Sequence, residues 1–213
     1  MGLFDKIKNA QHKADTSAKC PHCDAVLDPA PQRKKKCLSC GKDIYVRTDP
    51  LKREKILVNQ SDALSIDAIR TIGFTEKEYR AVAEGLAHKF KEAPSIGDIV
   101  WGIINERLLD SLKSGNWQQA KMLYWEQARL LYGIGMDFFR LLQESTKCEL
   151  HHYQSMDTNY KLEISAAAGS SCSKCHLLNG KILTITEALE TMPIPVKDCE
   201  MRFCRCVYLP VVE

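Results

Sequence analysis

Two closely spaced cysteine pairs near the start of the chain constrain its fold more than any other feature. Cys20 and Cys23 form one C-x-x-C pair, and Cys37 and Cys40 form a second, with 13 residues between the pairs. Each C-x-x-C turn places its two sulfurs on one side of a tight loop, and two facing turns can complete a tetrahedron around a zinc ion. The spacing therefore predicts one structural zinc site, whose four protein ligands leave no open coordination position for catalysis.

The setting of the ten cysteines favours metal binding over disulfide bonding. The N-terminal sequence lacks the apolar core of a signal peptide, and no apolar stretch is long enough to predict a membrane span. We therefore expect a cytoplasmic protein, in which thiols stay reduced and clustered cysteines act as metal ligands. A redox dithiol is the main alternative for either pair, but it needs a single pair in a thioredoxin-like context. His22 lies inside the first turn and is not needed as a ligand, since four sulfurs already fill the shell.

The residues that flank the first cluster add to the spacing. The segment opens with Cys-Pro-x-Cys at Cys20 and closes with Cys-x-x-Cys-Gly-Lys at Lys42, and strand-forming residues follow at 44–46. With these features it resembles the zinc-ribbon family over about residues 18–47. The resemblance implies a small zinc-held module of a kind that often binds nucleic acid or protein. We therefore expect a zinc ribbon at residues 20–47, after an N-terminal tail at residues 1–19.

A basic run stands directly before the second cysteine pair. It consists of Arg33, Lys34, Lys35 and Lys36, and residues 1–58 as a whole hold 13 Lys and Arg against 7 Asp and Glu. These side chains could contact nucleic-acid phosphates. Alternatively, they form a solvated loop whose positive charge offsets the negative charge of a zinc–tetrathiolate centre. Aromatic residues that could stack on bases are scarce nearby, with only Tyr45.

The middle of the chain, residues 61–156, has apolar residues at helical spacing. Capping sequences at Thr75 and Ser95 and a glycine at position 115 mark helix ends, and they predict helices over about 75–91 and 95–114. Two more helices are expected over about 117–132 and 137–153. The apolar stripes indicate core packing, so we expect a helical domain.

The C-terminal segment, residues 160–213, changes to strand patterns. Residues 160–164 alternate like a strand with one buried face, Asn179-Gly180 indicates a turn, and residues 207–209 indicate a final strand. Between them, Thr186 is expected to cap a short helix over 187–190. Residues 192–195 are expected to be extended, because each proline disfavours helical backbone in the residue before it. The segment is therefore predicted to be a small cysteine-rich β module.

A second cysteine cluster lies in this module. Its members are Cys172, Cys175, Cys199, Cys204 and Cys206. Five thiols exceed the four positions of a tetrahedral ion, so we prefer the first four, while Cys206 could replace either Cys199 or Cys204. His176 is a weaker alternative ligand. The cluster predicts a second zinc ion, and the alternative is a group of reduced cysteines that pack as small hydrophobes.

The motifs around this second cluster follow a definite order. A C-x-x-C pair is followed by a Leu-Asn-Gly-Lys turn at residues 178–181, a proline pair at 193 and 195, and a Cys-Arg-Cys ending. Over about residues 170–210 this order is similar to the C-terminal motif of tailed-phage head-morphogenesis (minor capsid) proteins. Asn179 stands where that family has Asp, and no histidine lies just before Cys204, although Cys199 could substitute for it. The resemblance implies phage ancestry and a capsid-assembly role.

Together these features predict an α+β protein with an N-terminal zinc ribbon, a helical middle domain and a small C-terminal cysteine-rich β module. No phosphate-binding loop, nucleophile elbow or H-E-x-x-H sequence is present. We therefore expect a non-enzymatic zinc-binding protein that acts as a protein–protein interaction module. The alternatives are a nucleic-acid-binding protein that uses the basic ribbon and a phage-derived head-assembly protein.

Overall fold

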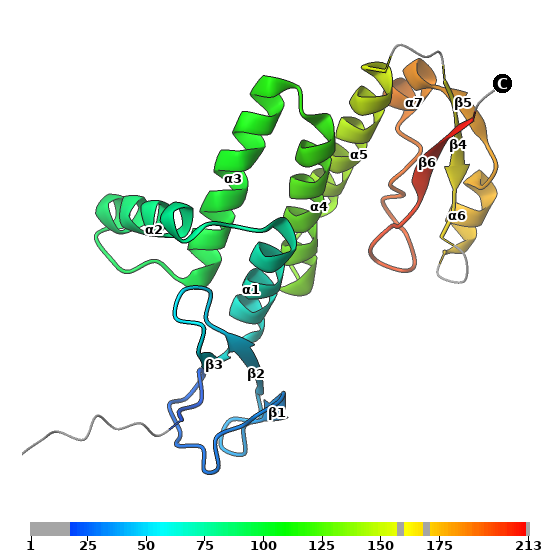
Figure 1. The fold of residues 1–213 in the computed structure, drawn as a ribbon. Coiled ribbons are helices and arrows are strands. Elements are labelled where there is room, and N and C mark those ends of the chain that lie inside the picture. The colour runs from blue at the N-terminus through cyan, green and yellow to red at the C-terminus, as the bar shows by residue number, and fades with distance from the viewer. Residues whose placement is uncertain (1–17, 157–159, 168–170, 212–213) are drawn as a thin grey trace, which may run out of the picture. The chain divides into compact units, whose positions relative to one another are not determined.

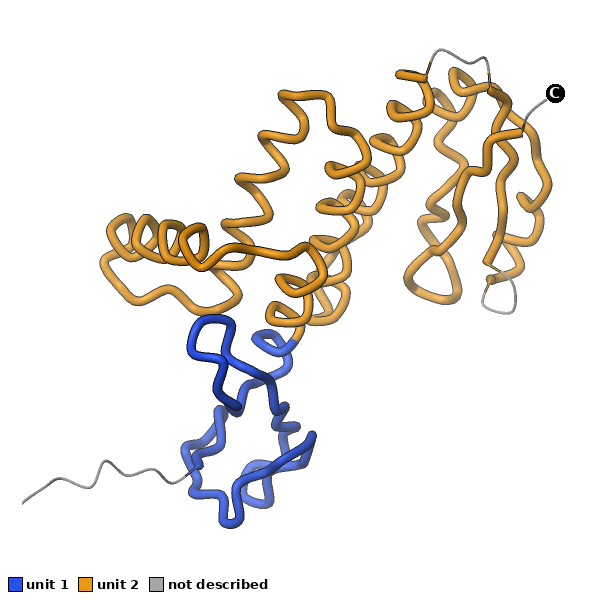
Figure 2. The backbone as a smooth tube through the Cα atoms, in the orientation of Figure 1, with its two compact units in different colours: residues 1–63 blue, residues 64–213 orange. Residues whose placement is uncertain are grey.

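The computed structural model describes residues 18–156, 160–167 and 171–211, so the predicted N-terminal tail lies outside the described residues up to position 17. Within the described ranges the chain has seven helices and two small antiparallel sheets, which confirms the predicted α+β class (Figure 1). The chain divides into two compact units, residues 1–63 and residues 64–213 (Figure 2). Each unit contains one of the sheets.

The sheet of the first unit has three short antiparallel strands in the order β1-β2-β3. β1 is Lys35–Lys36, β2 is Asp43–Thr48 and β3 is Lys55–Val58. Strand β2 contains the strand-forming residues noted in the sequence. Its Ile44 is fully buried and packs against Cys20 and Cys37. The first cysteine cluster therefore packs against strand β2.

Five helices form the middle of the chain. Their bounds are α1 Gln60–Ile72, α2 Glu76–Phe90, α3 Ile96–Ser114, α4 Trp117–Gly133 and α5 Phe139–Gln154. The last four match the helices predicted from the sequence to within two residues at every end. Among the described helices, none is both long enough and apolar enough to span a membrane.

Short-range capping rules account for where these helices begin and end. Thr75 Oγ1 accepts the Glu78 N–H at 3.1 Å, and the Glu78 carboxylate accepts the Thr75 N–H in return. Ser95 and Asp98 form the same reciprocal pair at the start of α3. Gly115 ends α3 with a φ of 69°, a left-handed conformation that glycine adopts without steric cost.

Helices α4 and α5 form a hairpin with polar contacts in its interior. Glu149 is only 8% exposed and pairs with Lys121 on the facing helix. Ser145 Oγ donates to the Lys121 backbone carbonyl at 2.9 Å. On the other side of α4, Gln127 Nε2 donates to Asn105 Oδ1 of α3 at 2.7 Å. Because buried polar groups must be satisfied, these bonds fix the register of the three helices.

The rest of the second unit is a three-stranded antiparallel sheet with two short helices. Its elements are β4 Lys161–Ser165, α6 Ser173–Leu178, β5 Ile182–Thr184, α7 Ile185–Thr191 and β6 Val207–Val211, with strand order β5-β4-β6. Leu162 and Ile164 are fully buried and alternate with more exposed neighbours, as predicted. They pack with Leu150 of α5, so this sheet shares a core with the helical hairpin.

Two local predictions for this segment are wrong. Helix α7 is capped by Thr184 rather than Thr186, because Thr184 and Glu187 form a capping box at the required spacing of three residues. Met192 is not extended but has a φ of 42°, and its N–H donates to the Ala188 carbonyl at 3.0 Å. The hydrogen bond that satisfies the Ala188 carbonyl at the helix end therefore outweighs the preference for extended backbone in a residue that precedes proline.

Arg107 ties three helices of the second unit together. From α3 its guanidinium donates two hydrogen bonds to the Glu78 carboxylate of α2, at 2.6 and 2.7 Å. It also donates to the carbonyl of Ile72, the last residue of α1, at 3.0 Å. The hydrogen bond from Arg107 holds the pKa of Glu78 below its ordinary value. Both side chains are less than a quarter exposed, so the pair is partly shielded from water.

We expect Arg107→Met to lower the free energy of unfolding by about 1–3 kcal/mol at neutral pH, because a partly buried carboxylate loses its partner. Since folding lowers the pKa of Glu78, the pair stabilises the fold above the ordinary glutamate range, near pH 4.3, and this stability is lost as the pH falls through the lowered value. The difference between variant and parent should therefore shrink in acid. Urea unfolding followed by helical circular dichroism at several pH values measures it.

The matched control is Arg80→Met, which breaks the exposed Glu76–Arg80 pair on α2. An exposed i,i+4 pair contributes at most about 0.5 kcal/mol, so this variant should unfold nearly like the parent protein. Equal losses in the two variants would contradict the role assigned to Arg107.

Candidate metal centres

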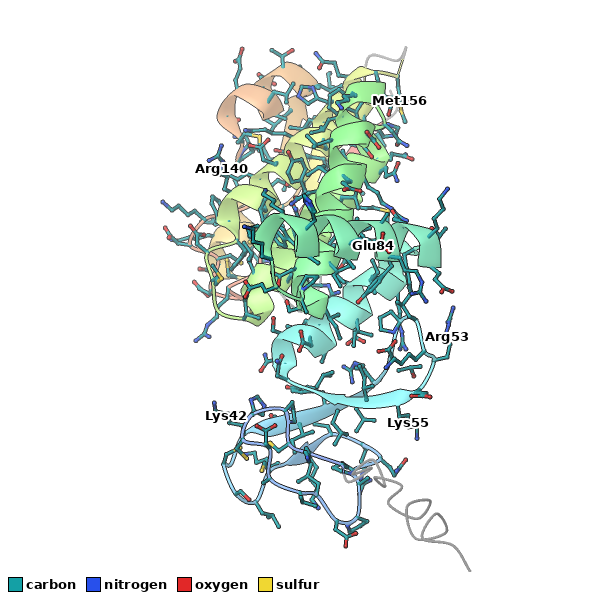
Figure 3. The ribbon with its side chains drawn as sticks, turned by 90° about the vertical axis from the view of Figure 1, so that its left-hand side faces the viewer. Lys42, Arg53, Lys55, Glu84, Arg140 and Met156 are labelled. Carbon is teal, nitrogen blue, oxygen red and sulfur yellow. The ribbon has the colours of Figure 1, made fainter. Side chains whose placement is uncertain are left out.

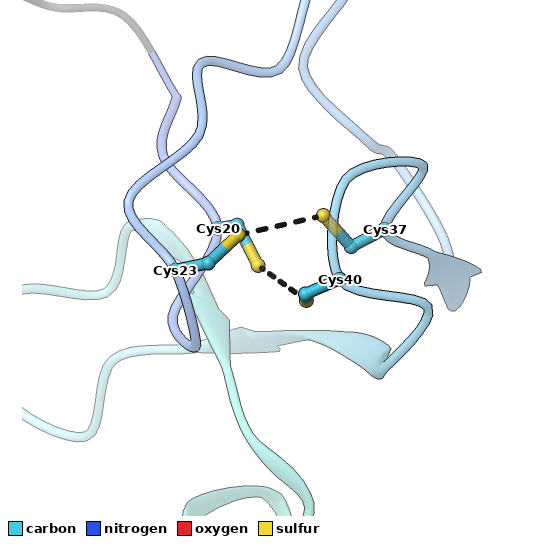
Figure 4. A group of neighbouring side chains, drawn as sticks. All are labelled: Cys20, Cys23, Cys37 and Cys40. Atoms are coloured by element: carbon cyan, nitrogen blue, oxygen red, sulfur yellow. Dashed lines mark hydrogen bonds between the residues drawn. The ribbon is translucent and has the colours of Figure 1, made fainter.

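Four sulfur atoms meet in the first unit. The Sγ atoms of Cys20, Cys23, Cys37 and Cys40 all lie within 4.8 Å of one another. Cys20 and Cys40 are 3.9 Å apart, and Cys23 and Cys37 are 3.8 Å apart (Figure 4). A tetrahedron with metal–sulfur bonds of about 2.3 Å has edges of about 3.8 Å. The four thiols predicted from the sequence are therefore brought together, and the cluster could hold a metal ion.

The two turns that carry these sulfurs have the same backbone hydrogen bonds. In each turn the carbonyl of the first cysteine accepts the N–H four residues later, from Asp24 in one turn and Gly41 in the other. The N–H of each first cysteine donates to the carbonyl five residues later, at 2.9 Å in both. Asp24 and Gly41 both have positive φ, 56° and 72°. Aspartate tolerates this conformation better than most residues, which explains why only one turn needs glycine.

The surroundings of Cys37 favour its thiolate form. The backbone N–H of Cys40, and also that of Ser39, donates to the Cys37 sulfur and lowers the pKa of the thiol to about 6, against the opposing effect of burial. Cys20 and Cys37 are almost fully buried, whereas Cys23 is exposed. These amide contacts are of the kind that orient and stabilise metal ligands.

His22 does not point to the metal-binding position. Its Nε2 lies 2.9 Å from the backbone carbonyl of Asp43, so the side chain links the first turn to strand β2. The histidine therefore has a structural contact in the loop, and the four sulfurs form the cluster without it.

The four residues of the basic run beside the first cluster differ in their secondary structure and in their side-chain contacts. All four side chains, Arg33, Lys34, Lys35 and Lys36, are exposed, and the last two form β1. Lys34 Nζ lies 2.8 Å from Asp43 Oδ2 and 4.7 Å from the centre of the Tyr45 ring. The hydrogen bond to Asp43 raises the pKa of Lys34 and in turn lowers that of the carboxyl. The run is therefore paired with neighbouring side chains in part, rather than being a uniform charged loop.

Five sulfurs meet in the second unit, in two overlapping groups. Cys172, Cys175 and Cys199 form one group, and Cys175, Cys204 and Cys206 form the other; within each group all sulfurs lie within 4.8 Å. The Cys175 sulfur is 3.4 Å from that of Cys172, 3.8 Å from that of Cys199 and 3.9 Å from that of Cys204. Cys175 is thus common to both groups, and the cluster could hold a metal ion.

The local backbone positions the Cys172 thiol and donates hydrogen bonds to it. Cys172 is the N-cap residue of α6, so the C-x-x-C pair here opens a short helix. The backbone N–H of Cys175, and also that of Glu200, donates to the Cys172 sulfur and lowers its pKa to about 7. Burial raises the pKa of Cys206 to about 11. Burial also raises the pKa of Cys175 and of Cys199. In the absence of a cation, Cys172 is therefore the thiol of this group with a lowered pKa, and three of its neighbours have raised ones.

Phe203 joins the second cluster to the α4–α5 hairpin. It lies in the loop between Cys199 and Cys204 and is only 8% exposed. Its ring meets the Trp125 ring edge-on, with ring centres 4.8 Å apart, and stacks on the Phe138 ring, with ring centres 5.1 Å apart. The cysteines share a buried cluster with two hairpin residues, Ala128 and Leu142. Phe203 was not predicted from the sequence, although an aromatic residue between two cysteines of the cluster is a visible signal.

Two further side chains near the second cluster have definite contacts. Asn179 Oδ1 accepts the Ala166 N–H at 2.8 Å, a bond that an aspartate oxygen could also accept. His176, the weaker ligand candidate, is exposed and its Nε2 lies 3.0 Å from Ser171 Oγ.

Cys148 lies outside both clusters, and burial raises its pKa to about 11, so it is protonated at neutral pH.

No protein-family model, curated protein or solved structure matches this chain at a significant level. The geometry of the two cysteine clusters and the surfaces around them are therefore the basis for inferring its function.

We expect Cys175→Ser to abolish metal binding at the second cluster, because Cys175 belongs to both sulfur groups. Cys204→Ser and Cys206→Ser should each keep one ion there, with an affinity lowered by about 10–100-fold, since Cys175 remains together with three neighbouring thiols. Elemental analysis gives the ions per chain, and competition with a coloured chelator gives the affinity. Unchanged metal content in Cys175→Ser would contradict the shared role of this sulfur.

We expect Phe203→Ala to lower the free energy of unfolding of the second unit by about 3–5 kcal/mol, because the loss of a buried aromatic ring leaves a cavity. Denaturant unfolding followed by circular dichroism measures the change. Leu209→Ala is the matched control, since Leu209 is 47% exposed on the same module and its loss should cost far less. Similar losses in the two variants would rule out an anchoring role for Phe203.

Proposed function

We propose that this chain is a non-enzymatic zinc-binding protein in which two structural zinc centres hold small modules for binding a protein partner. The observation that carries the proposal is the spacing of the first four sulfurs, at 3.8 and 3.9 Å along two edges of a tetrahedron. This spacing matches an all-thiolate zinc site, for which edges of about 3.8 Å are expected.

The chemistry of the ligands supports zinc over other divalent ions. Both clusters offer only soft sulfur atoms, whereas magnesium, calcium and manganese prefer oxygen. Zinc accepts a tetrahedral set of four thiolates without a redox change. With four protein ligands no position stays open for water or substrate, which supports a structural role rather than catalysis.

The size of the first unit supports a need for the metal. Its buried apolar cluster contains Ile44 and two of the ligand cysteines, with a few partly buried neighbours such as Leu27 and Leu57. An interior this small does not offset the entropy of ordering the chain. Bonds from four side chains to one ion would supply the missing free energy.

Exposed apolar side chains support a protein partner. In the sheet of the second unit, Glu163 of β4 lies opposite Ile182 of β5 and opposite Leu209 of β6, so the three residues share one face. Ile182 is 53% exposed and Leu209 is 47% exposed. In the first unit, Leu38 between two ligand cysteines is 92% exposed. Apolar residues grouped in this way on a surface are often covered by another protein.

Assembly of a phage head is a second candidate for the protein-binding role. The Cys199 sulfur lies within 4.8 Å of those of Cys172 and Cys175, so it could substitute as a ligand for the histidine that the phage-like motif has just before its Cys-Arg-Cys ending. Asn179 accepts a hydrogen bond that the aspartate of the motif could also accept. Genes for portal and capsid proteins beside the gene for this chain would support this candidate.

We expect the purified protein to contain two zinc ions per chain. Excess chelator should unfold the first unit and leave most helical signal, because the apolar interior of the helices does not depend on the ion. Elemental analysis gives the metal content, and amide NMR dispersion reports the first unit. Cys37→Ser should lose one ion, whereas Cys148→Ser, a buried cysteine outside both clusters, should lose none. A metal-free first unit that stays folded would overturn the proposal.

A further inference from the structure

Basic side chains from separate segments gather on one face of the sheet in the first unit. In the β1–β2 register Lys36 lies directly opposite Asp43, and residues that are directly opposite share a face. Lys34 reaches the same face, because its Nζ pairs with the Asp43 carboxylate. Side chains alternate along a strand, so Tyr45 and Arg47 follow Asp43 on this side.

The same alternation places Lys35 on the other face. Lys35 lies opposite Ile44, whose side chain is buried against the cysteine cluster. Neighbouring lysines of one basic run therefore belong to different surfaces. This difference gives the chain a built-in comparison between two exposed residues of equal charge.

A surface depression extends the basic side of the sheet. Lys36, Lys42, His22 and the backbone at Gly41 line it, together with Asp43 and Gln60. Lys42 is exposed and projects from the loop that leads into β2 (Figure 3). The basic face is defined here as Lys34, Lys36, Lys42 and Arg47.

Tyr45 lies among these cations and orders two of them. The Lys34 ammonium is 4.7 Å from the ring centre, and the Arg47 guanidinium is 5.8 Å from it. Such cation–π contacts hold long side chains in place that would otherwise sample many rotamers. The basic face contains four cations, and the Asp43 carboxylate among them is paired with Lys34.

We propose that the basic face binds the phosphodiester backbone of nucleic acid. Lysine ammonium groups bind phosphates as point charges, and an aromatic ring among them offers a surface on which a base can stack. The residues of the basic face differ from the apolar residues assigned to a protein partner, and the inference rests on the proposed function only in needing the metal-held fold of the first unit.

The test is the binding of a labelled oligonucleotide to the full-length zinc-loaded protein, measured by fluorescence anisotropy at about 50–200 mM salt. Single-stranded DNA, RNA of the same sequence and the DNA duplex are compared. With four contacts at most, the logarithm of affinity should fall with the logarithm of salt at a slope of about −2 to −3.5. The double variant Lys36→Gln/Lys42→Gln should bind about tenfold more weakly, with a slope shallower by about 1.5–2.

The control is the double variant Lys35→Gln/Lys52→Gln, which removes the same charge from exposed positions off the basic face. It should keep its affinity to within about twofold, because net charge alone contributes little at this salt. Tyr45→Phe should also bind normally, since it keeps the ring, whereas Tyr45→Ala should bind more weakly. The zinc content of every variant is measured, so a loss of fold is told apart from a loss of binding.

Three results would overturn the inference while the zinc centres stand. One is the absence of oligonucleotide binding by the zinc-loaded parent protein. Another is an equal loss of affinity in the two double variants. The third is equally tight binding of labelled polyglutamate to the same face, which would indicate an acidic protein instead. A preference between single strands and duplex would identify the form of nucleic acid that the face binds.

Discussion

Sulfur atoms brought together by two short turns occupy the middle of the first unit, where larger domains have apolar side chains. Thiolates at these distances repel one another, so they lie close together stably when a cation neutralises them or when they stay protonated. Strand β2 depends on this arrangement, because its buried Ile44 packs directly against two of the cysteines. The sheet that presents the charged side chains is therefore packed directly against the sulfur cluster.

The second cluster has a different physical context. Its cysteines pack against a large helical hairpin through Phe203, and the adjoining sheet shares a core with Leu150 of α5. Apolar burial and thiol chemistry thus act on the same few residues. Two of the three buried residues in the core cluster of the first unit are cysteines, whereas the cysteines of the second unit adjoin an extensive apolar interior.

Features fixed by neighbours in the sequence were predictable. The capping boxes at Thr75 and Ser95 follow from residue types three positions apart, and the first cluster follows from two turns of known spacing. The predicted start of α7 was wrong because the capping rule was applied to Thr186, whereas Thr184 forms the capping box.

Features that depend on pairing between distant segments were not predictable. The division of the basic run required the β1–β2 register, because a shift of one residue exchanges the two faces. The contact of Phe203 with Trp125 and Phe138 joins segments more than sixty residues apart, and no local pattern specifies such a partner. The choice among five thiols depends in the same way on loop positions that only the fold determines.

The position of Phe203 between two cysteines of the second cluster has a thermodynamic consequence if the cluster holds an ion. The loop that would contribute cysteines to an ion also contains the Phe203 ring, which packs against the α4–α5 hairpin. The same short segment therefore takes part in both ion binding and ring packing. Linkage requires the effect to be reciprocal: if the ion tightens the packing of the ring, the packed ring must raise the affinity for the ion by the same factor. The hairpin is then a remote contributor to the ion's dissociation constant, although it supplies no ligand.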